Sequence, residues 1–517
     1  MKLEKTKNAK RNIIWGSISK IVLLLLPFIT RTILINKLGS DYLGLNTLFT
    51  SILSVLSLAE LGFSEAVVFH MYDPIAKEDN KTINAILKML NKVYFVVGVV
   101  ILVLGIAIMP FLKYLIKGDI PSDVNLYILF TIFLANNAVS YFGLSYRTSL
   151  FPAHQRNDII NKIQTIVTSF MNVIQIIVLL CFQNYYLYII FLPIGTLITY
   201  IILFNIAKRK YPEYYPDGAL STEQVSSIKK NIKGIVLHKL GGVLSNSADS
   251  IIISAILGLT VLAMYSNYFY VITVLSGFYV VITDGIMGGV GNSLATESRE
   301  KNYSDLIKFS FMGCWIVSWC TVCLCSLYQP FMLIWVGDSL MFNTATMLLF
   351  GLYFYVMRFD SIGGVYKSAL GVWNEDCFRP IISGLLNLSL NIILALILNT
   401  YAPEYSVIGI LLSSIICKLF IDYPWGSIVT FRKMGGGMKK YTLFLVFYSI
   451  VTLVSIVVTY LLCDLIPMER EILGIWYFVL RLGICVIVPN VIFTLFYFKL
   501  KAFKDSKNFI LSHLKRN

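Results

Sequence analysis

Charged side chains are scarce in this sequence. Asp, Glu, Lys and Arg make up 14% of the 517 residues, whereas 57% of the residues are hydrophobic. A soluble domain carries about 25% charged residues, so the composition excludes a soluble globular enzyme and a disordered chain. The 4 histidines lie far apart and most of the 9 cysteines fall inside apolar runs. No spacing typical of a metal site results, and we expect no metal and no catalytic residues.

The apolar residues are gathered in long runs. A helix of about 20 apolar residues is long enough to cross a hydrocarbon core of ~30 Å. No segment shows the period-two alternation of a membrane β-barrel. The sequence therefore predicts an all-α polytopic membrane protein with about 14 transmembrane helices. The fourteen runs are residues 13–36, 42–70, 87–111, 124–150, 161–181, 186–206, 234–257, 261–286, 306–328, 341–366, 380–398, 406–430, 441–463 and 472–498.

The positive charge of the chain follows the expected membrane topology. There are 43 Lys and Arg against 28 Asp and Glu, a net charge of +15. If the N-terminus is inside and fourteen spans alternate, 33 of the 43 basic residues lie in inside segments and four outside. The positive-inside rule then predicts that both termini are cytoplasmic. We expect these basic segments to contact anionic membrane lipids, and we expect no nucleic-acid partner.

The sequence contains an internal repeat with an offset of 219 or 220 residues. An offset of 219 superimposes Leu38-Gly39 on Leu257-Gly258 and Asn172 on Asn391, and an offset of 220 superimposes Tyr146-Arg147 on Tyr366-Lys367. We predict two six-helix lobes, 1–206 and 234–432, in a parallel pseudo-twofold repeat. Residues 207–233 form a cytoplasmic linker with an interfacial helix, and 433–517 hold two appended C-terminal helices and a basic cytoplasmic tail. Two such lobes are typical of a transporter that works by alternating access.

Polar residues recur at helical spacing within several of these runs. Such a stripe either lines a wet cavity or hydrogen-bonds a neighbouring helix. In the first half of the chain the stripes run through the second and fifth spans. In the second half they run through the seventh and eighth spans, and the repeat places Asn391 of the eleventh span at the position of Asn172. The candidates for polar cavity residues are Asn46, Thr50, Asn172, Gln175, Tyr270 and Asn391.

Charged residues inside the spans are stronger functional candidates, because each one costs about 2.5–3.5 kcal/mol at the membrane centre. Arg31 either contacts a substrate phosphate or pairs with an acid such as Glu60. Lys20 and Arg358 are the other candidate anion ligands, although Lys20 could also snorkel to the interface. The candidate coupling or gate residues are Glu60, Glu65, Asp249 and Asp284.

The N-terminal third resembles bacterial polysaccharide (Wzx-type) flippases of the multidrug/oligosaccharidyl-lipid/polysaccharide exporter superfamily. The layout of six, six and two spans agrees with that family. The residues that carry the resemblance are Asn12-Ile13-Ile14-Trp15-Gly16-Ser17, Arg31-Thr32-Ile33-Leu34-Ile35, Leu38-Gly39-Ser40-Asp41-Tyr42-Leu43-Gly44-Leu45-Asn46, Leu58-Ala59-Glu60-Leu61-Gly62-Phe63 and Tyr72-Asp73-Pro74.

The resemblance implies transfer of a polyprenyl-diphosphate-linked oligosaccharide across the bacterial cytoplasmic membrane. Arg31 best matches the cavity Arg and Lys residues that family members use for the diphosphate, with Lys20 and Arg358 as further candidates. The polar cavity residues would then meet the sugars. No cofactor is expected, the cycle being driven by protons, sodium or the membrane potential, and the protein is expected to act as a monomer beside polysaccharide assembly enzymes.

Three other functions compete with this interpretation. A drug/cation antiporter of the same superfamily would use the acidic residues, although those proteins usually have twelve spans. A lipid II flippase is the second alternative, because the appended helices resemble a pair that borders a lipid-tail groove in that branch. The third, a membrane-embedded polymerase or ligase, would need a large outside loop, and the longest outside connections here are short.

Overall fold

The computed structural model describes residues 5–57, 63–372, 375–466 and 474–514, and these form helices without a strand. Eleven helices in this part of the chain are long and apolar enough to cross a membrane. The count becomes twelve if the bent pair Leu126–Tyr141 and Ser145–Ala153, which meet at 59°, is one span. The predicted all-α polytopic class is confirmed.

The fourteen predicted runs are largely helical where they are described, although turns at residues 142–144 interrupt the run 124–150. Two of them do not add to the count of spans. The run 42–70 is divided between α2 (Ser40–Leu56) and α3 (Phe63–Ala76), with 58–62 outside the described residues. The run 234–257 belongs to α9 (Thr222–Leu257), which continues without a break from the linker. The interfacial position predicted for the start of this helix stays a prediction. A side-chain capping box of Ser221 and Gln224 begins α9.

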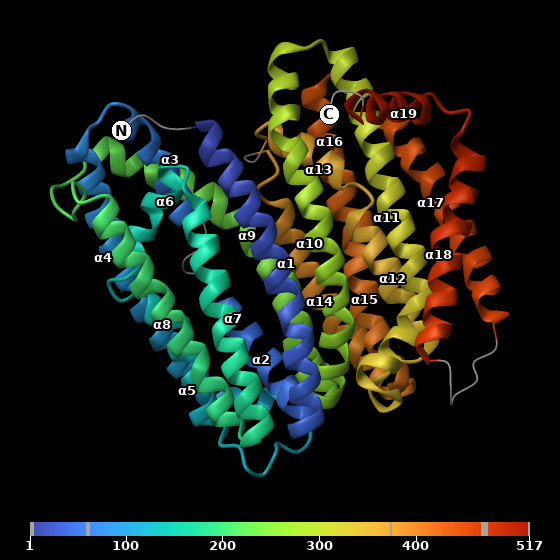
Figure 1. The fold of residues 1–517 in the computed structure, drawn as a ribbon, viewed down its shortest axis with the longest axis horizontal. Helices are drawn as coiled ribbons and strands as arrows, with labels where there is room; N and C mark the ends of the chain where they lie inside the picture. The colour runs from blue at the N-terminus through green and yellow to red at the C-terminus, as the bar shows by residue number, and fades with distance from the viewer. Residues whose placement is uncertain (1–4, 58–62, 373–374, 467–473, 515–517) are drawn as a thin grey trace. The chain divides into compact units, whose positions relative to one another are not determined.

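The chain divides into two compact units, residues 1–266 and 267–517, with the boundary inside α10 (Leu259–Thr296). In the first unit α1 packs on α7, α7 on α8, α5 on α8 and α2 on α9 (Figure 1). The predicted lobes, which rest on sequence similarity, stay a prediction. The remaining elements of this unit are α1 (Lys5–Leu38), α4 (Asn80–Ile108), η2 (Met109–Leu115), α5 (Leu126–Ala138), η3 (Val139–Tyr141), η4 (Ser145–Ser149), α6 (Leu150–Ala153), α7 (Asn157–Cys181) and α8 (Tyr185–Lys210).

The second unit is built around α11 (Arg299–Val336), which contacts α12, α13, α17, α18 and α19. The amphipathic C-terminal α19 runs across the direction of the other helices and packs on α11 through Phe509 and Phe309, whose rings are 5.8 Å apart (Figure 1). The other elements are η5 (Asp338–Leu340), α12 (Thr344–Arg358), α13 (Ser361–Ala369), α14 (Arg379–Tyr401), η6 (Pro403–Tyr405), α15 (Ser406–Cys417), the π-helix η7 (Lys418–Asp422), α16 (Tyr423–Met434), α17 (Met438–Asp464), α18 (Gly474–Tyr497) and α19 (Lys501–Leu514).

The sequence repeat has a local structural counterpart at two glycines. Gly39 separates α1 from α2 with a φ of 111°, and Gly258 separates α9 from α10 with a φ of 99°. Both have an extended ψ, a backbone conformation that is essentially restricted to glycine. The 219-residue offset therefore superimposes two helix breaks of the same kind.

Histidine 154 fixes the loop that follows α6. Its ring stacks on Tyr211, with centroids 4.4 Å apart, and on Tyr214, at 5.6 Å. Burial and the nearby positive charge of Lys210 lower the pKa of His154 from 6.5 to about 4. The imidazole is therefore neutral at physiological pH and acts as a packing group between this loop and the linker.

A close helix approach in the first unit offers a test of the packing. Gly44 of α2 lies against the backbone of Leu259, and a Cβ at position 44 would overlap the Leu259 carbonyl group. We expect Gly44→Ala to lower the free energy of unfolding by about 1–3 kcal/mol, because a backbone group cannot rotate away. Thermal unfolding of the purified protein measures this effect.

Gly285→Ala serves as the matched control. Gly285 also lies inside a helix, α10, but a Cβ there would meet nothing within 4 Å. Alanine should therefore leave the unfolding temperature unchanged or raise it. An equal response of both variants would contradict the close approach.

Candidate functional site

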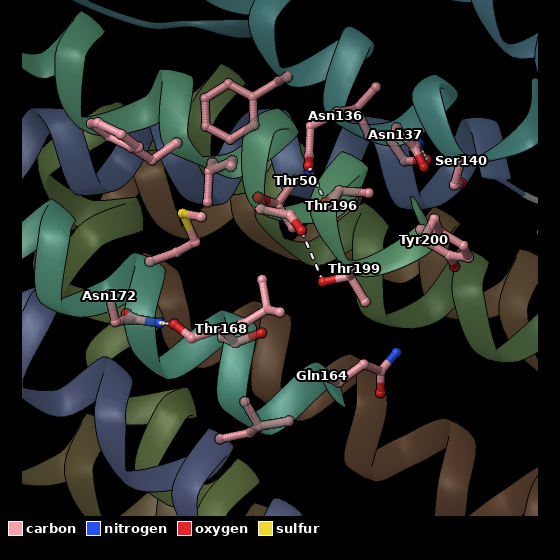
Figure 2. Close-up of a pocket in the computed structure, with 18 of the residues that line it drawn as sticks. Thr50, Asn136, Asn137, Ser140, Gln164, Thr168, Asn172, Thr196, Thr199 and Tyr200 are labelled. Carbon is pink, nitrogen blue, oxygen red and sulfur yellow. Dashed lines mark hydrogen bonds between the residues drawn. The ribbon is translucent and has the colours of Figure 1, made fainter. Parts of the chain in front are cut away.

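The first unit contains a cavity of 930 Å³ between α2, α5, α7 and α8, with a contribution from α1 (Figure 2). Cavities that bind small ligands usually have volumes of about 300–1,000 Å³. The residues that line it are Leu23, Asn46, Thr50, Leu53, Ser54, Ser57, Phe133, Asn136, Asn137, Ser140, Tyr141, Gln164, Val167, Thr168, Met171, Asn172, Gln175, Phe191, Leu192, Gly195, Thr196, Thr199 and Tyr200.

The lining is polar but carries no charged side chain among the described residues. Six of the lining residues have side-chain amides and seven have Ser or Thr hydroxyls. Inside a membrane, amides and hydroxyls need hydrogen-bond partners, which come from neighbouring helices, from water or from a ligand. A side chain that is already bonded to a helix is less available to a ligand than one without a partner in the protein.

Four of the six amides, Gln175 among them, are hydrogen-bonded to other helices or to their own helix. The Thr196 hydroxyl donates to Asn136 Oδ1 at 2.7 Å and connects α8 to α5. Asn137 Nδ2 donates to Ser57 Oγ at 2.8 Å. Asn172 Nδ2 donates to the Thr168 carbonyl oxygen at 2.8 Å. These bonds set the shape of the cavity wall.

Other polar side chains face the cavity with their hydrogen-bonding capacity unused. Asn46 and Thr50 lie one turn apart on α2, and Gln164 and Thr168 lie one turn apart on α7. Their side chains have no hydrogen-bond partner in the part of the chain that the structure describes. Figure 2 shows Gln164 and Thr168 on the α7 wall of the cavity. These four side chains are available to a bound molecule.

Aromatic rings complete the lining. Tyr141, Tyr200, Phe133 and Phe191 come from η3, α8, α5 and α8. Amides and hydroxyls that donate and accept hydrogen bonds, next to ring faces, suit a molecule with many hydroxyl groups and apolar C–H faces. A glycan has this chemistry, and the cavity is large enough for a small oligosaccharide.

Residues 9–285 match the family model described as polysaccharide biosynthesis protein. This match spans more than half of the chain. The chain belongs to the polysaccharide biosynthesis protein family. The resemblance found in the N-terminal third is thereby confirmed. A search of curated proteins finds no significant match.

Solved structures show that this polysaccharide biosynthesis protein has the fold of the MOP superfamily transporters. A multidrug resistance MATE family transporter in an inward-facing conformation aligns with a TM-score of 0.61 and 12% identity, over 82% of this chain and 99% of that one. The lipid II flippase MurJ in an inward closed conformation aligns with a TM-score of 0.61 and 15% identity, over 94% and 98%. A MOP superfamily transporter from Pyrococcus furiosus aligns with a TM-score of 0.54 and 12% identity, over 83% and 97%. The family member described here is a multi-pass membrane protein.

Four of the six predicted polar cavity residues line this cavity. Asn46 and Thr50 are on α2, and Asn172 and Gln175 are on α7. Gln175 is 4% exposed and donates to the Tyr188 carbonyl oxygen at 3.0 Å, which ties α7 to α8. In this family member Gln175 therefore shapes the wall, whereas Asn46 and Thr50 remain open to a ligand.

The other two predicted polar residues belong to the second unit. Asn391 is fully buried, and its Nδ2 donates to Asn387 Oδ1 at 3.2 Å while the Ser413 hydroxyl donates to its Oδ1. These bonds join α14 to α15, so Asn391 acts as a link between packed helices. Tyr270 is partly buried on α10.

None of the three predicted anion ligands is among the residues that line the cavity. Arg31 Nη1 donates to the carbonyl oxygen of Ser266 at 3.2 Å and to its hydroxyl at 3.3 Å. Lys20 is exposed on α1. Arg358, at the end of α12, donates from Nε to the Ser276 hydroxyl at 3.2 Å. Their roles toward a diphosphate stay predictions.

The predicted coupling or gate residues have separate surroundings. Asp249 is 4% exposed and accepts a hydrogen bond from the Tyr265 hydroxyl at 3.2 Å. Asp284 is exposed on α10. Glu60 and the side chain of Glu65 lie outside the described residues. Their proposed coupling or gating function stays a prediction.

The sequence reasoning missed the polar residues of the fourth and sixth spans. Asn136 and Asn137 of α5, and Thr196 and Thr199 of α8, form one side of the cavity. The signal was an Asn-Asn pair inside an apolar run and two threonines at a spacing of three. Neither pattern forms a long stripe, so it differs little from ordinary packing of membrane helices.

Proposed function

We propose that this protein is a flippase that moves a polyprenyl-diphosphate-linked oligosaccharide across the bacterial cytoplasmic membrane by alternating access. The observation that carries the proposal is the cavity of 930 Å³ lined by amides, hydroxyls and aromatic rings. It supports recognition of a glycan, in a chain of the polysaccharide biosynthesis family with a transporter fold. The glycan would occupy the cavity while the polyprenyl tail stays in lipid.

The orientation that we propose follows from the charge distribution. Both termini are cytoplasmic, because this orientation places 33 of the 43 basic residues inside. The protein needs no cofactor and acts as a monomer beside the enzymes that assemble the polysaccharide, in contact with anionic lipids. Protons, sodium ions or the membrane potential drive the cycle.

Reconstitution tests the proposal. Proteoliposomes are loaded with polyprenyl-diphosphate-linked oligosaccharide that carries a fluorescent label on the sugar, and dithionite then quenches label in the outer leaflet. We expect the protected half of the label to become accessible in vesicles with protein, and faster when a proton or sodium gradient is imposed. Empty vesicles and vesicles with labelled phosphatidylcholine are the controls.

Three results would contradict the proposal. Label that stays protected under every gradient would exclude transport of this substrate. Export of ethidium with no movement of the oligosaccharide would favour a drug/cation antiporter. Movement of labelled lipid II at a higher rate than the oligosaccharide would favour a lipid II flippase.

A further inference from the structure

Arg147 is a buried arginine next to the cavity that the proposed mechanism has not used. It lies in η4, the second half of the broken span that begins with α5, and is 7% exposed. Its Nε donates to the Tyr146 hydroxyl at 3.2 Å, and its guanidinium carbon lies 5.3 Å from the centroid of the Phe204 ring. Its Nη1 is buried without a hydrogen-bond partner among the described residues.

These contacts do not neutralise the guanidinium. The described residues provide a phenol and two ring faces, and none of the ion pairs found among them includes Arg147. A buried charge is tolerated when a carboxylate or another anion compensates for its lost hydration, and ring faces compensate only in part. Arg147 can therefore bind an anion that the described residues of the first unit do not supply.

The repeat shows what the second unit has in the same place. The offset of 220 superimposes Tyr146-Arg147 on Tyr366-Lys367. The two segments also hold similar places in their units. In the first unit η4 follows α5 and contacts α4 and α8. In the second unit α13 follows α12 and contacts α11 and α16. Lys367 Nζ lies 2.5 Å from Asp376 Oδ2, a fully buried carboxylate.

The offset of 220 places no carboxylate of the first unit at the position of Asp376. The residue that the same offset superimposes on Asp376 is Arg156, which forms its own ion pair with Asp158 at 2.8 Å. The second unit thus neutralises its cation internally, whereas the first unit places a further cation at the matching position. If Arg147 had the same structural role as Lys367, the first unit would need a carboxylate at the position of Asp376. That position holds Arg156 instead.

Arg147 adjoins one end of the cavity. Ser140 and Tyr200 line that end and lie on the same side of the view in Figure 2. The Ser145 hydroxyl of η4 donates to the Ser140 carbonyl oxygen at 2.7 Å. Phe204, which the guanidinium faces, is one helical turn beyond Tyr200 on α8. η4 and α8 therefore connect Arg147 with residues that line this end of the cavity.

We infer that Arg147 is an anion-binding residue that takes the phosphoryl oxygens of the substrate while its glycan occupies the cavity. The inference rests on the proposed function for the identity of the substrate. A guanidinium matches two phosphoryl oxygens with two parallel N–H donors, which an ammonium group cannot do. The same phosphoryl chemistry occurs in anionic lipid headgroups, so the test must separate the two sources.

Calorimetry with inorganic pyrophosphate tests the inference without sugar, lipid tail or transport. The full-length protein is placed in phosphatidylcholine nanodiscs, and wild type is compared with Arg147→Gln and Arg147→Lys. We expect R147Q to weaken pyrophosphate binding at least about tenfold and R147K to weaken it less, because a lysine keeps the charge but loses the paired donors. Lys162→Gln, which removes an exposed cation from the same unit, should change the affinity less than about twofold.

Unfolding temperature separates binding from folding. A group retained for an external anion should not be needed for stability, so R147Q should unfold at the wild-type temperature or above it. If R147Q does not fold, the inference is tested by comparing the pyrophosphate affinity of R147K with that of wild type. Undiminished pyrophosphate affinity in R147Q, or in R147K when R147Q is lost, would overturn the inference.

Two further arms assign the source of the anion and keep this test separate from the transport test. If phosphatidylglycerol in the nanodiscs abolishes the Arg147-dependent binding, the site belongs to a lipid headgroup and the inference about the substrate is wrong. If the binding persists, and farnesyl diphosphate shows the same dependence on Arg147, the inference is supported. Absence of oligosaccharide flipping in proteoliposomes would overturn the proposed function, but not Arg147-dependent binding of pyrophosphate.

Discussion

Replacing Asp376 with alanine is expected to lower the free energy of unfolding by about 3–5 kcal/mol, because it leaves buried cations without their counter-ion. Asp376 is fully buried in the second unit. Its carboxylate oxygens lie 2.5 Å from Lys367 Nζ and 2.7 Å from Arg379 Nε. Arg379 also pairs with Asp422, so the loss of Asp376 disturbs the connection between α13, α14 and η7. Thermal and chemical unfolding of the purified variant measures the effect.

Asp73→Ala provides the matched control. Asp73 pairs with Lys77 at 2.9 Å, but the two side chains are 73% and 70% exposed. A solvent-exposed pair contributes about 0–1 kcal/mol, so this variant should unfold close to the wild-type temperature. Equal destabilisation by the two substitutions would contradict the structural role of the buried cluster.

The effect of Asp376 should also depend on pH. Burial raises the pKa of this carboxyl, but hydrogen bonds from Arg379 and Lys367 outweigh it and hold the pKa below its ordinary value. A carboxyl with a lowered pKa in the folded state stabilises the protein above its unfolded pKa, and this stabilisation is lost as the pH falls. The difference in stability between wild type and Asp376→Asn should therefore shrink below a pH of about 4.

Placing a phenylalanine at Thr168 is expected to reduce oligosaccharide flipping by at least about tenfold, a barrier of about 1.4 kcal/mol, because the ring would occupy the cavity. The Thr168 side chain faces the cavity and has no hydrogen-bond partner in the described part of the chain. Removal of the Thr168 hydroxyl in Thr168→Phe should therefore leave the unfolding temperature nearly unchanged. The labelled-oligosaccharide assay in proteoliposomes measures the rate.

Two variants control for the position and for the chemistry. Ile166→Phe adds a ring to the same helix at a residue that is 51% exposed and is not among the residues lining the cavity, so flipping should stay near the wild-type rate. Thr168→Ser keeps the hydroxyl without adding volume and should retain most of the activity. Equal inhibition by T168F and I166F would show that the cavity is not the transport path.

Two long polar patterns in the sequence coincide with the wall of the cavity. The stripes through Asn46 and Thr50 and through Asn172 and Gln175 repeat over several helical turns, and all four residues line the cavity. Asn391 shows the limit of this reasoning, because it occupies the repeat position of Asn172 but is buried between two helices. Spacing along a helix shows which residues share a face. It does not show whether that face meets a cavity or another helix.

The charged residues clearly predicted a membrane protein, but they were a weaker guide to the residues that bind an anion. Arg31 was the strongest candidate for an anion ligand, and the structure places it against Ser266, within the first unit. Arg147 is not among the anion ligands that the sequence predicts, and its burial at a broken span could not be read from its sequence neighbours. The cost of burying a charge depends on its three-dimensional surroundings, which composition does not describe.

The sequence by itself determined that this protein is a helical membrane protein, because the scarcity of charge and the length of its apolar runs leave no other way to satisfy the backbone in lipid. It also indicated the polysaccharide family and two of the cavity helices. Only the tertiary structure decided which polar residues face the cavity, and which cations have an internal carboxylate. Lys367 and Arg147 match in sequence, but a buried Asp376 lies beside Lys367 while aromatic rings lie beside Arg147. Residues distant in the chain provide these neighbours, and they determine whether a charge serves folding or ligand binding.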